Sequence, residues 1–163
     1  MDPAEEPSLA RRAVEEAASR SLTVATAESL TAGLVAAALA DVPGSSAVLR
    51  GGVVSYHNDV KSALLGVDPV LLATSGSVDA EVARQMAVGA RSSCGSDLAV
   101  STTGVAGPAA HDGQGVGTVF IGYAGPAGSG AERLHLTGDR QAIRAASRDA
   151  ALARLLALVW DAT

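Results

Sequence analysis

Aromatic side chains are scarce in this sequence: they make up 2% of its 163 residues, with one Trp, two Tyr and one Phe. Hydrophobic residues nevertheless reach 48% and charged residues only 18%, which excludes a disordered chain. The core must therefore be built from Ala, Val and Leu. The length suits one domain, which we place at residues 8–163 behind a flexible tail at residues 1–7.

Cysteine and long apolar runs are also lacking. The single cysteine, Cys94, cannot form an internal disulfide and offers no metal cluster, so we expect a reducing compartment and no metal ion or cofactor. The longest apolar stretch, residues 34–40, is far shorter than the about 20 residues of a membrane-spanning helix. The acidic N-terminus has no apolar run behind it. The sequence thus predicts a cytoplasmic protein with no signal peptide and no membrane partner.

Basic residues are fewer than acidic ones, and almost all of them are Arg. The sequence has 12 Lys and Arg and 17 Asp and Glu, which gives a net charge of −5. This excludes a general nucleic-acid binder, which needs a basic face, but leaves room for a local anion site. The one lysine is Lys61. Because a desolvated Lys can give up its proton and Arg cannot, Lys61 is a candidate general base; a leftover surface cation is the equally open alternative.

Apolar periodicity predicts helices alternating with strands. We expect helices at residues 8–20, 30–40, 58–65, 80–93 and 139–160, and strands at 22–27, 47–56, 97–102, 116–124 and 131–136. Residues 70–74 fit no single pattern, and residues 103–117 form a Gly-rich loop long enough to be functional. This order implies a three-layer α/β/α domain with a mixed, mostly parallel sheet and one β-hairpin.

Ser29 stands where the first strand passes into a helix, a place where ligands bind in open α/β folds. Three roles stay open for it: helix N-cap, which is the commonest for a serine here, phosphate contact, and nucleophile. Glu28 beside it is a candidate structural carboxylate for nearby amides. If Ser29 is the nucleophile, Lys61 is the base it needs, and the amides of the following helix are candidate oxyanion donors.

Two further segments carry candidate chemistry. The loop after residue 102 has free amides suited to a phosphate or carboxylate, although it matches neither a Walker loop nor a dinucleotide fingerprint. Arg140 near a helix start offers a bidentate contact to such an anion, or is a solvated first-turn residue. His111 and His135 have no partner at metal-ligand spacing, and no G-x-S-x-G elbow supports a Ser-His-Asp triad.

Several motifs in order resemble one family. They are AESLTAG, RGGVVSYHNDVK, LLGV, TTGVAGP, VGTVFIG and GDR, between residues 27 and 140. Together they resemble the CinA C-terminal domain family of nicotinamide-nucleotide amidohydrolases. The resemblance spans about residues 8–160. It implies hydrolysis of nicotinamide mononucleotide to nicotinic acid mononucleotide and ammonia, within pyridine nucleotide recycling and without a cofactor. It also makes a homodimer the expected assembly.

The resemblance also implies roles for individual residues. The family's serine nucleophile falls on Ser29 and its lysine base on Lys61, and Tyr56 matches a tyrosine that orients the lysine or the substrate. By position, Arg140 is the candidate phosphate contact. The other expected substrate-site residues are Glu28, Thr31, Ala32, Gly33, Asn58, Thr103 and Gly104.

The sequence departs from the family pattern at two places near this site. Ala32 stands where the family usually has Gly, which matters if the backbone needs a glycine conformation there. Residues 109–111 replace part of a glycine run and alter the loop. These departures leave a second hypothesis open: a weak or inactive module of the same fold that binds a pyridine nucleotide without hydrolysing it.

Overall fold

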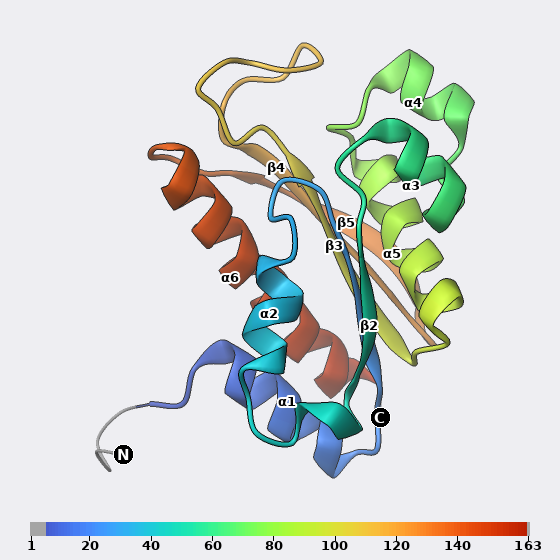
Figure 1. Cartoon of the computed structure of the whole chain (residues 1–163), viewed down its shortest axis with the longest axis vertical. Coiled ribbons are helices and arrows are strands. Elements are labelled where there is room, and N and C mark those ends of the chain that lie inside the picture. The colour runs from blue at the N-terminus through green and yellow to red at the C-terminus, as the bar shows by residue number, and fades with distance from the viewer. Residues whose placement is uncertain (1–5, 163) are drawn as a thin grey trace.

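The computed structural model describes residues 6–162 and has a five-stranded sheet between two layers of helices (Figure 1). The strands are β1 (Val24–Glu28), β2 (Leu49–Val54), β3 (Leu98–Gly104), β4 (Thr118–Gly125) and β5 (Gly128–His135). The helices are α1 (Leu9–Ser19), α2 (Leu34–Ala40), α3 (Asn58–Leu65), α4 (Pro69–Ser75), α5 (Ala80–Cys94) and α6 (Arg140–Asp161), with a 3₁₀ turn, η1 (Ser45–Ala47). The predicted three-layer α/β architecture is confirmed. Residues 1–5 of the predicted tail lie outside the described residues.

The sheet order is β2-β1-β3-β4-β5. Strand β1 pairs in parallel with β2 and β3, whereas β4 is antiparallel to both of its neighbours. The predicted mixed sheet and the β4–β5 hairpin are therefore confirmed. In this register Glu28 lies between Val54 and Thr102. The segments that follow β1, β2 and β3 consequently meet at one edge of the sheet, where open α/β folds bind ligands.

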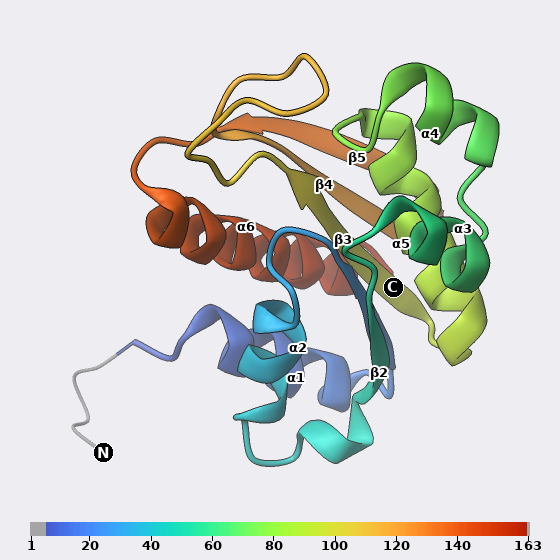
Figure 2. The same ribbon diagram turned by 45° about the horizontal axis from the view of Figure 1, so that its top comes forward.

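Helices α1, α2 and α6 cover one face of the sheet, and α3, α4 and α5 cover the other (Figure 2). Small residues let these layers approach closely without aromatic side chains. Ala25, Ala27 and Ala99 are fully buried under α5. A side chain at Gly122 of β4 would collide with the carbonyl of Ala83 in α5, so this helix rests directly on the strand backbone.

Several boundaries differ from the sequence prediction; β5, for example, begins at Gly128 and not at residue 131. Helix α2 begins at Leu34, not at residue 30, because residues 29–33 form a turn. Strand β3 continues to Gly104, which shortens the loop before β4. The ambiguous residues 70–74 belong to α4, where Asp68 caps the helix through the amide of Val70. Within residues 6–162, no helix is both long and apolar enough to cross a membrane.

Candidate active site

Ser29 and Lys61 lie against each other at the carboxyl edge of the sheet. Ser29 directly follows β1, and Lys61 lies in the first turn of α3, a helix that His57 caps. The Nζ atom of Lys61 is 3.1 Å from Ser29 Oγ and donates a second hydrogen bond, also of 3.1 Å, to the main-chain carbonyl of Tyr56. The structure thus brings the predicted serine and lysine to a distance at which a proton can pass between them.

Lys61 is fully buried, at 0% exposure. Desolvation disfavours its cation and lowers the pKa of Lys61 from 10.5 to about 8, while the negative charge of Asp112 opposes part of this shift. At pH 7 about one molecule in ten therefore carries a neutral Lys61. Burial excludes the alternative that Lys61 is a leftover surface cation, and its lowered pKa suits a base that works near neutral pH.

Glu28 lies on the opposite face of β1 and is also buried. Its carboxylate accepts hydrogen bonds from the amides of Val35 at 2.8 Å and Ala36 at 3.0 Å. The hydroxyls of Thr31 at 2.7 Å and Thr26 at 3.4 Å complete the shell. Glu28 is therefore the structural carboxylate that the sequence suggested, and it caps α2 from seven residues upstream.

The N-cap role considered for Ser29 is wrong, since Gly33 occupies that position. The amides of Leu34 and Ala37 donate to the carbonyls of Thr31 and Gly33, and the two amides between them donate to Glu28. All four amides of the first turn are occupied. The expectation that this helix supplies oxyanion donors is therefore corrected: such donors have to come from the turn and the loop.

The turn at residues 29–33 is strained where the family pattern differs. Ala32 has φ +47° and Gly33 has φ +102°, so both occupy the left-handed region. A side chain there is unfavourable by about 1–2 kcal/mol. Arg144 of α6 donates to two carbonyl oxygens of this turn, at 2.8 and 3.2 Å, and helps to hold it in place.

A cleft of about 330 Å³ opens beside Ser29. Its wall consists of Ser29, Leu30, Tyr56, Ser77, Arg140 and residues 104–111. None of these lining residues is acidic, although the protein as a whole has a net charge of −5. A cleft with a cation and without a carboxylate in its wall favours an anionic ligand.

Tyr56 and Arg140 form part of the cleft's rim. Arg140 donates to the Tyr56 hydroxyl at 3.0 Å and to the carbonyl of Gly107 at 2.7 Å. Tyr56 thus positions Lys61 through its backbone, whereas its ring, 58% exposed, faces the rim. Both acceptors of Arg140 are neutral, so its charge is not balanced by an acidic partner among them.

Five of the predicted site residues lie at the cleft, and six do not. Four of the five line it, namely Ser29, Tyr56, Gly104 and Arg140, and the fifth, Lys61, lies behind Ser29. The others do not line it, namely Glu28, Thr31, Ala32, Gly33, Asn58 and Thr103. Thr31 and Thr103 are buried, and their hydroxyls bond within the protein. Their contribution is to hold the turn and the loop in shape.

Sequence reasoning missed a cluster in the loop after β3. The Asp112 carboxylate accepts from the amide of Ser77 at 2.9 Å and from its hydroxyl at 3.1 Å, and His111 Nε2 lies 3.3 Å from the same oxygen. The bonds from Ser77 lower the pKa of Asp112, so it stays ionised at neutral pH. The sequence placed Asp112 only within the Gly-rich loop at residues 103–117.

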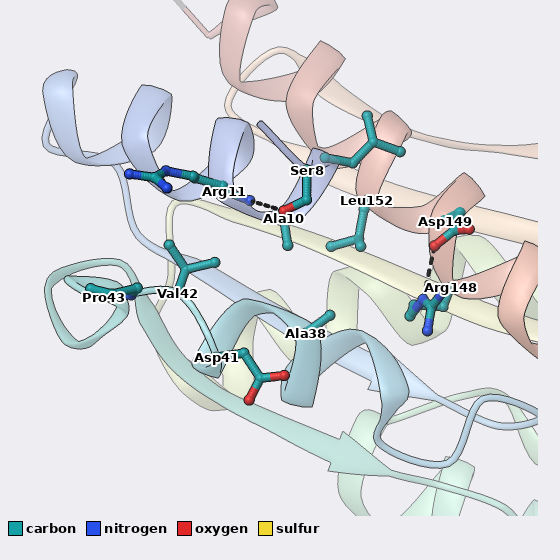
Figure 3. A pocket seen from close by; sticks show the side chains of 11 residues that line it. Ser8, Ala10, Arg11, Ala38, Asp41, Val42, Pro43, Arg148, Asp149 and Leu152 are labelled. Atoms are coloured by element: carbon teal, nitrogen blue, oxygen red, sulfur yellow. Dashed lines mark hydrogen bonds and ion pairs between the residues drawn. The ribbon is translucent and has the colours of Figure 1, made fainter. Parts of the chain in front are cut away.

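A larger hollow, of about 390 Å³, lies between α1, the end of α2 and α6 (Figure 3). It holds none of the predicted site residues. Its serine, Ser8, caps α1, and its Arg148 and Asp149 pair at 2.8 Å. Size alone therefore does not locate the chemistry. In the described part of the chain, no three His, Cys, Asp or Glu residues are grouped so as to hold a metal ion.

This chain is similar to known proteins over most of its length. The CinA C-terminal domain matches residues 6–159. A CinA-like protein of Frankia casuarinae is 51% identical over 125 residues, which cover 77% of this chain and 29% of that protein. A CinA-like protein of Geobacter sulfurreducens is 48% identical over 134 residues, which cover 82% of this chain and 32% of that protein. The chain spans about a third of the length of these curated relatives.

Solved structures agree with this match. A competence/damage-inducible protein of Agrobacterium tumefaciens superposes with a TM-score of 0.88 at 39% identity, covering 92% of this chain and 93% of that one. A CinA superfamily protein of Klebsiella pneumoniae superposes with a TM-score of 0.89 at 30% identity, covering 94% of this chain and 96% of that one. With its sequence and its fold both matched over nearly their full extent, this chain belongs to the CinA C-terminal domain family.

Proposed function

We propose that this protein hydrolyses the carboxamide of nicotinamide mononucleotide, giving nicotinic acid mononucleotide and ammonia. The observation that carries the proposal is the 3.1 Å contact between Ser29 Oγ and the buried Nζ of Lys61, whose pKa of about 8 suits a base. The geometry supports acyl transfer by a serine. The choice of substrate comes from the motif resemblance.

In the proposed reaction, neutral Lys61 removes the Ser29 proton while Oγ attacks the carboxamide carbon. The carbonyl electron pair moves to oxygen and then returns, breaking the C–N bond, and Lys61 passes its proton to the nitrogen that leaves as ammonia. Water next attacks the Ser29 ester, again losing a proton to Lys61, which protonates the departing Oγ. The free acid is released, and Ser29 and neutral Lys61 return to their starting protonation states.

The negative oxygen of the intermediates needs hydrogen-bond donors. Within the described residues, the amides of Leu30, Ala106 and Gly107 have no hydrogen-bond partner, and all three residues line the cleft. The amide of the residue after the nucleophile is such a donor in other serine hydrolases. We therefore assign Leu30, with one loop amide, to the oxyanion, in place of the occupied amides of α2.

The ionic character of the cleft fits a nucleotide. Arg140 is held at the rim by neutral acceptors, and the lining residues include no carboxylate that would repel a phosphate. A ligand phosphate beside Arg140 would gain a charge-assisted hydrogen bond.

The test is ammonia release from nicotinamide mononucleotide by the purified protein. We expect turnover by the wild type and a loss of at least 100-fold in Ser29→Ala. Ser46→Ala is the matched control, since Ser46 is exposed and remote from the cleft. Absence of ammonia from the wild type, or equal release by Ser29→Ala, would contradict the proposal.

A module that binds without hydrolysis is the second candidate, favoured by the strained Ala32 and by residues 109–111 in the cleft wall. Calorimetric titration separates the two. Saturable binding of nicotinamide mononucleotide without any ammonia formed would favour the binding module.

A further inference from the structure

We propose that His111 is a second contact for a phosphomonoester in this cleft and makes the site prefer phosphorylated over unphosphorylated carboxamides. The inference rests on the proposed function for the remainder of the ligand. His111 belongs to the loop between β3 and β4 and lines the same cleft as Ser29 and Arg140. It is one of the residues by which this loop departs from the family's glycine run.

The imidazole is held by an anchored carboxylate. Asp112, whose oxygen lies 3.3 Å from Nε2, is itself fixed by two hydrogen bonds from Ser77. The carbonyl of Ser77 in turn accepts from Thr103 of β3 at 2.7 Å. A side chain at Gly76 would run into the Asp112 carboxyl, so this position is closely packed. His111 is thus tied through two bonded links to the sheet.

The other ring nitrogen is available for a ligand. Nδ1 of His111 has no hydrogen-bond partner within residues 6–162, and the side chain is 65% exposed. With Nε2 donating to Asp112, Nδ1 carries a proton in the imidazolium ion, and this is the form in which His111 can donate to a phosphate oxygen. A hydrogen bond to a doubly charged group is stronger than one to a neutral acceptor.

The charges around the cleft favour this assignment. Arg140 and His111 are the ionisable nitrogen groups in its wall, and Lys61 lies behind Ser29. Asp112 is the carboxylate beside His111, and the same Asp112 oxygen also accepts two hydrogen bonds from Ser77. A phosphomonoester carries up to two negative charges and three acceptor oxygens, which suits two donors in one cleft.

The test compares nicotinamide mononucleotide with nicotinamide riboside in the variant His111→Gln. We expect KM for the phosphorylated compound to rise roughly tenfold, the loss of one charge-assisted hydrogen bond, with kcat within about twofold. KM for the riboside should stay unchanged. His135→Gln is the matched control, since His135 is exposed on β5 and outside the cleft.

Binding measurements distinguish this inference from the proposed function. Both compounds are titrated calorimetrically into Ser29→Ala with and without His111→Gln. If the wild type releases no ammonia but His111→Gln still reduces the preference for the phosphorylated compound, the proposed function fails and the inference stands. An equal change for both compounds, no change, or no saturable binding of either compound overturns the inference.

Discussion

Glu28 and Ser29 are consecutive residues, yet their surroundings differ in kind. The Glu28 carboxylate is buried on the α2 side and receives four hydrogen bonds, two from amides and two from hydroxyls. Ser29 faces the other layer, where its one side-chain partner in the described residues is Lys61. Lys61 is buried without a carboxylate in hydrogen-bonding contact and has a lowered pKa.

The comparison shows two different consequences of burying an ionisable side chain. A buried charge that is fully hydrogen-bonded stabilises the fold, and removing it leaves orphaned donors. A buried amine with few partners is instead destabilising as a cation, and this same cost makes it a base at neutral pH. Glu28 therefore belongs to the scaffold and Lys61 to the proposed chemistry, although Glu28 directly precedes Ser29 in the chain and Lys61 Nζ lies 3.1 Å from Ser29 Oγ.

The largest expected effect concerns the base. Lys61→Arg preserves the charge but cannot release its proton, so we predict a loss of ammonia release of about 10²–10⁴-fold. A steady-state assay with nicotinamide mononucleotide measures it, and circular dichroism checks that the variant is folded. Retained activity would mean that another group is the base.

The second effect concerns the scaffold. Glu28→Ala leaves the amides of Val35 and Ala36 without their acceptor, and we expect it to lower the free energy of unfolding by about 3 kcal/mol. Urea denaturation measures the change. Glu15→Ala on the exposed side of α1 is the control, expected within about 0.5 kcal/mol of wild type. Equal changes in both would refute the capping role.

The third prediction concerns a substitution that raises the stability of the fold, whereas Glu28→Ala lowers it. Folding lowers the pKa of Lys61 from 10.5 to about 8, so the folded state binds fewer protons than the unfolded state between these pH values. Wild-type stability thus rises with pH across that window, and the cost of the buried cation is complete below it. We expect Lys61→Met to be more stable by about 2 kcal/mol at pH 7, after allowing for its lost hydrogen bonds.

The advantage of Lys61→Met should shrink as the pH rises from 8 towards 10.5, because the wild-type amine becomes neutral in both states. Thermal or urea unfolding at several pH values measures this. A variant that is less stable than wild type at every pH would show that the buried lysine is not a stability cost.

The smallest expected effect concerns the strained turn at residues 29–33, which connects β1 to α2. Ala32→Gly relieves a positive φ, and we expect a gain of about 0.5–1 kcal/mol after the larger backbone entropy of Gly in the unfolded chain. Ala37→Gly, in the regular part of α2 and exposed, should instead lose about 1 kcal/mol. A loss in both variants would exclude strain at Ala32.

Much of the fold and the central pair were predictable from local pattern. Parallel strands end at a common edge, so a serine after one strand and a lysine just after its neighbour were expected to converge, and they do. The start of α2 was not predicted correctly. The sequence suggests a serine cap, but the acceptor is Glu28, seven and eight residues before the amides it binds.

The loop contacts were beyond the reach of local pattern. Asp112 bonds to Ser77 across 35 residues, and Arg140 bonds to Tyr56 across 84. Neither pair has a characteristic spacing, because each joins segments far apart in the sequence that only the complete fold brings together. His111 accordingly received no role from sequence, since it has no partner at metal-ligand spacing and no motif supports a Ser-His-Asp triad.

The most direct test of the central claim is the pH dependence of kcat/KM for ammonia release. If Lys61 is the base, kcat/KM should rise nearly tenfold per pH unit below pH 7 and level off above the Lys61 pKa of about 8. A profile that is flat between pH 6.5 and 9.5, or the same rising limb in the residual activity of Lys61→Arg, would contradict the assignment of Lys61 as the base.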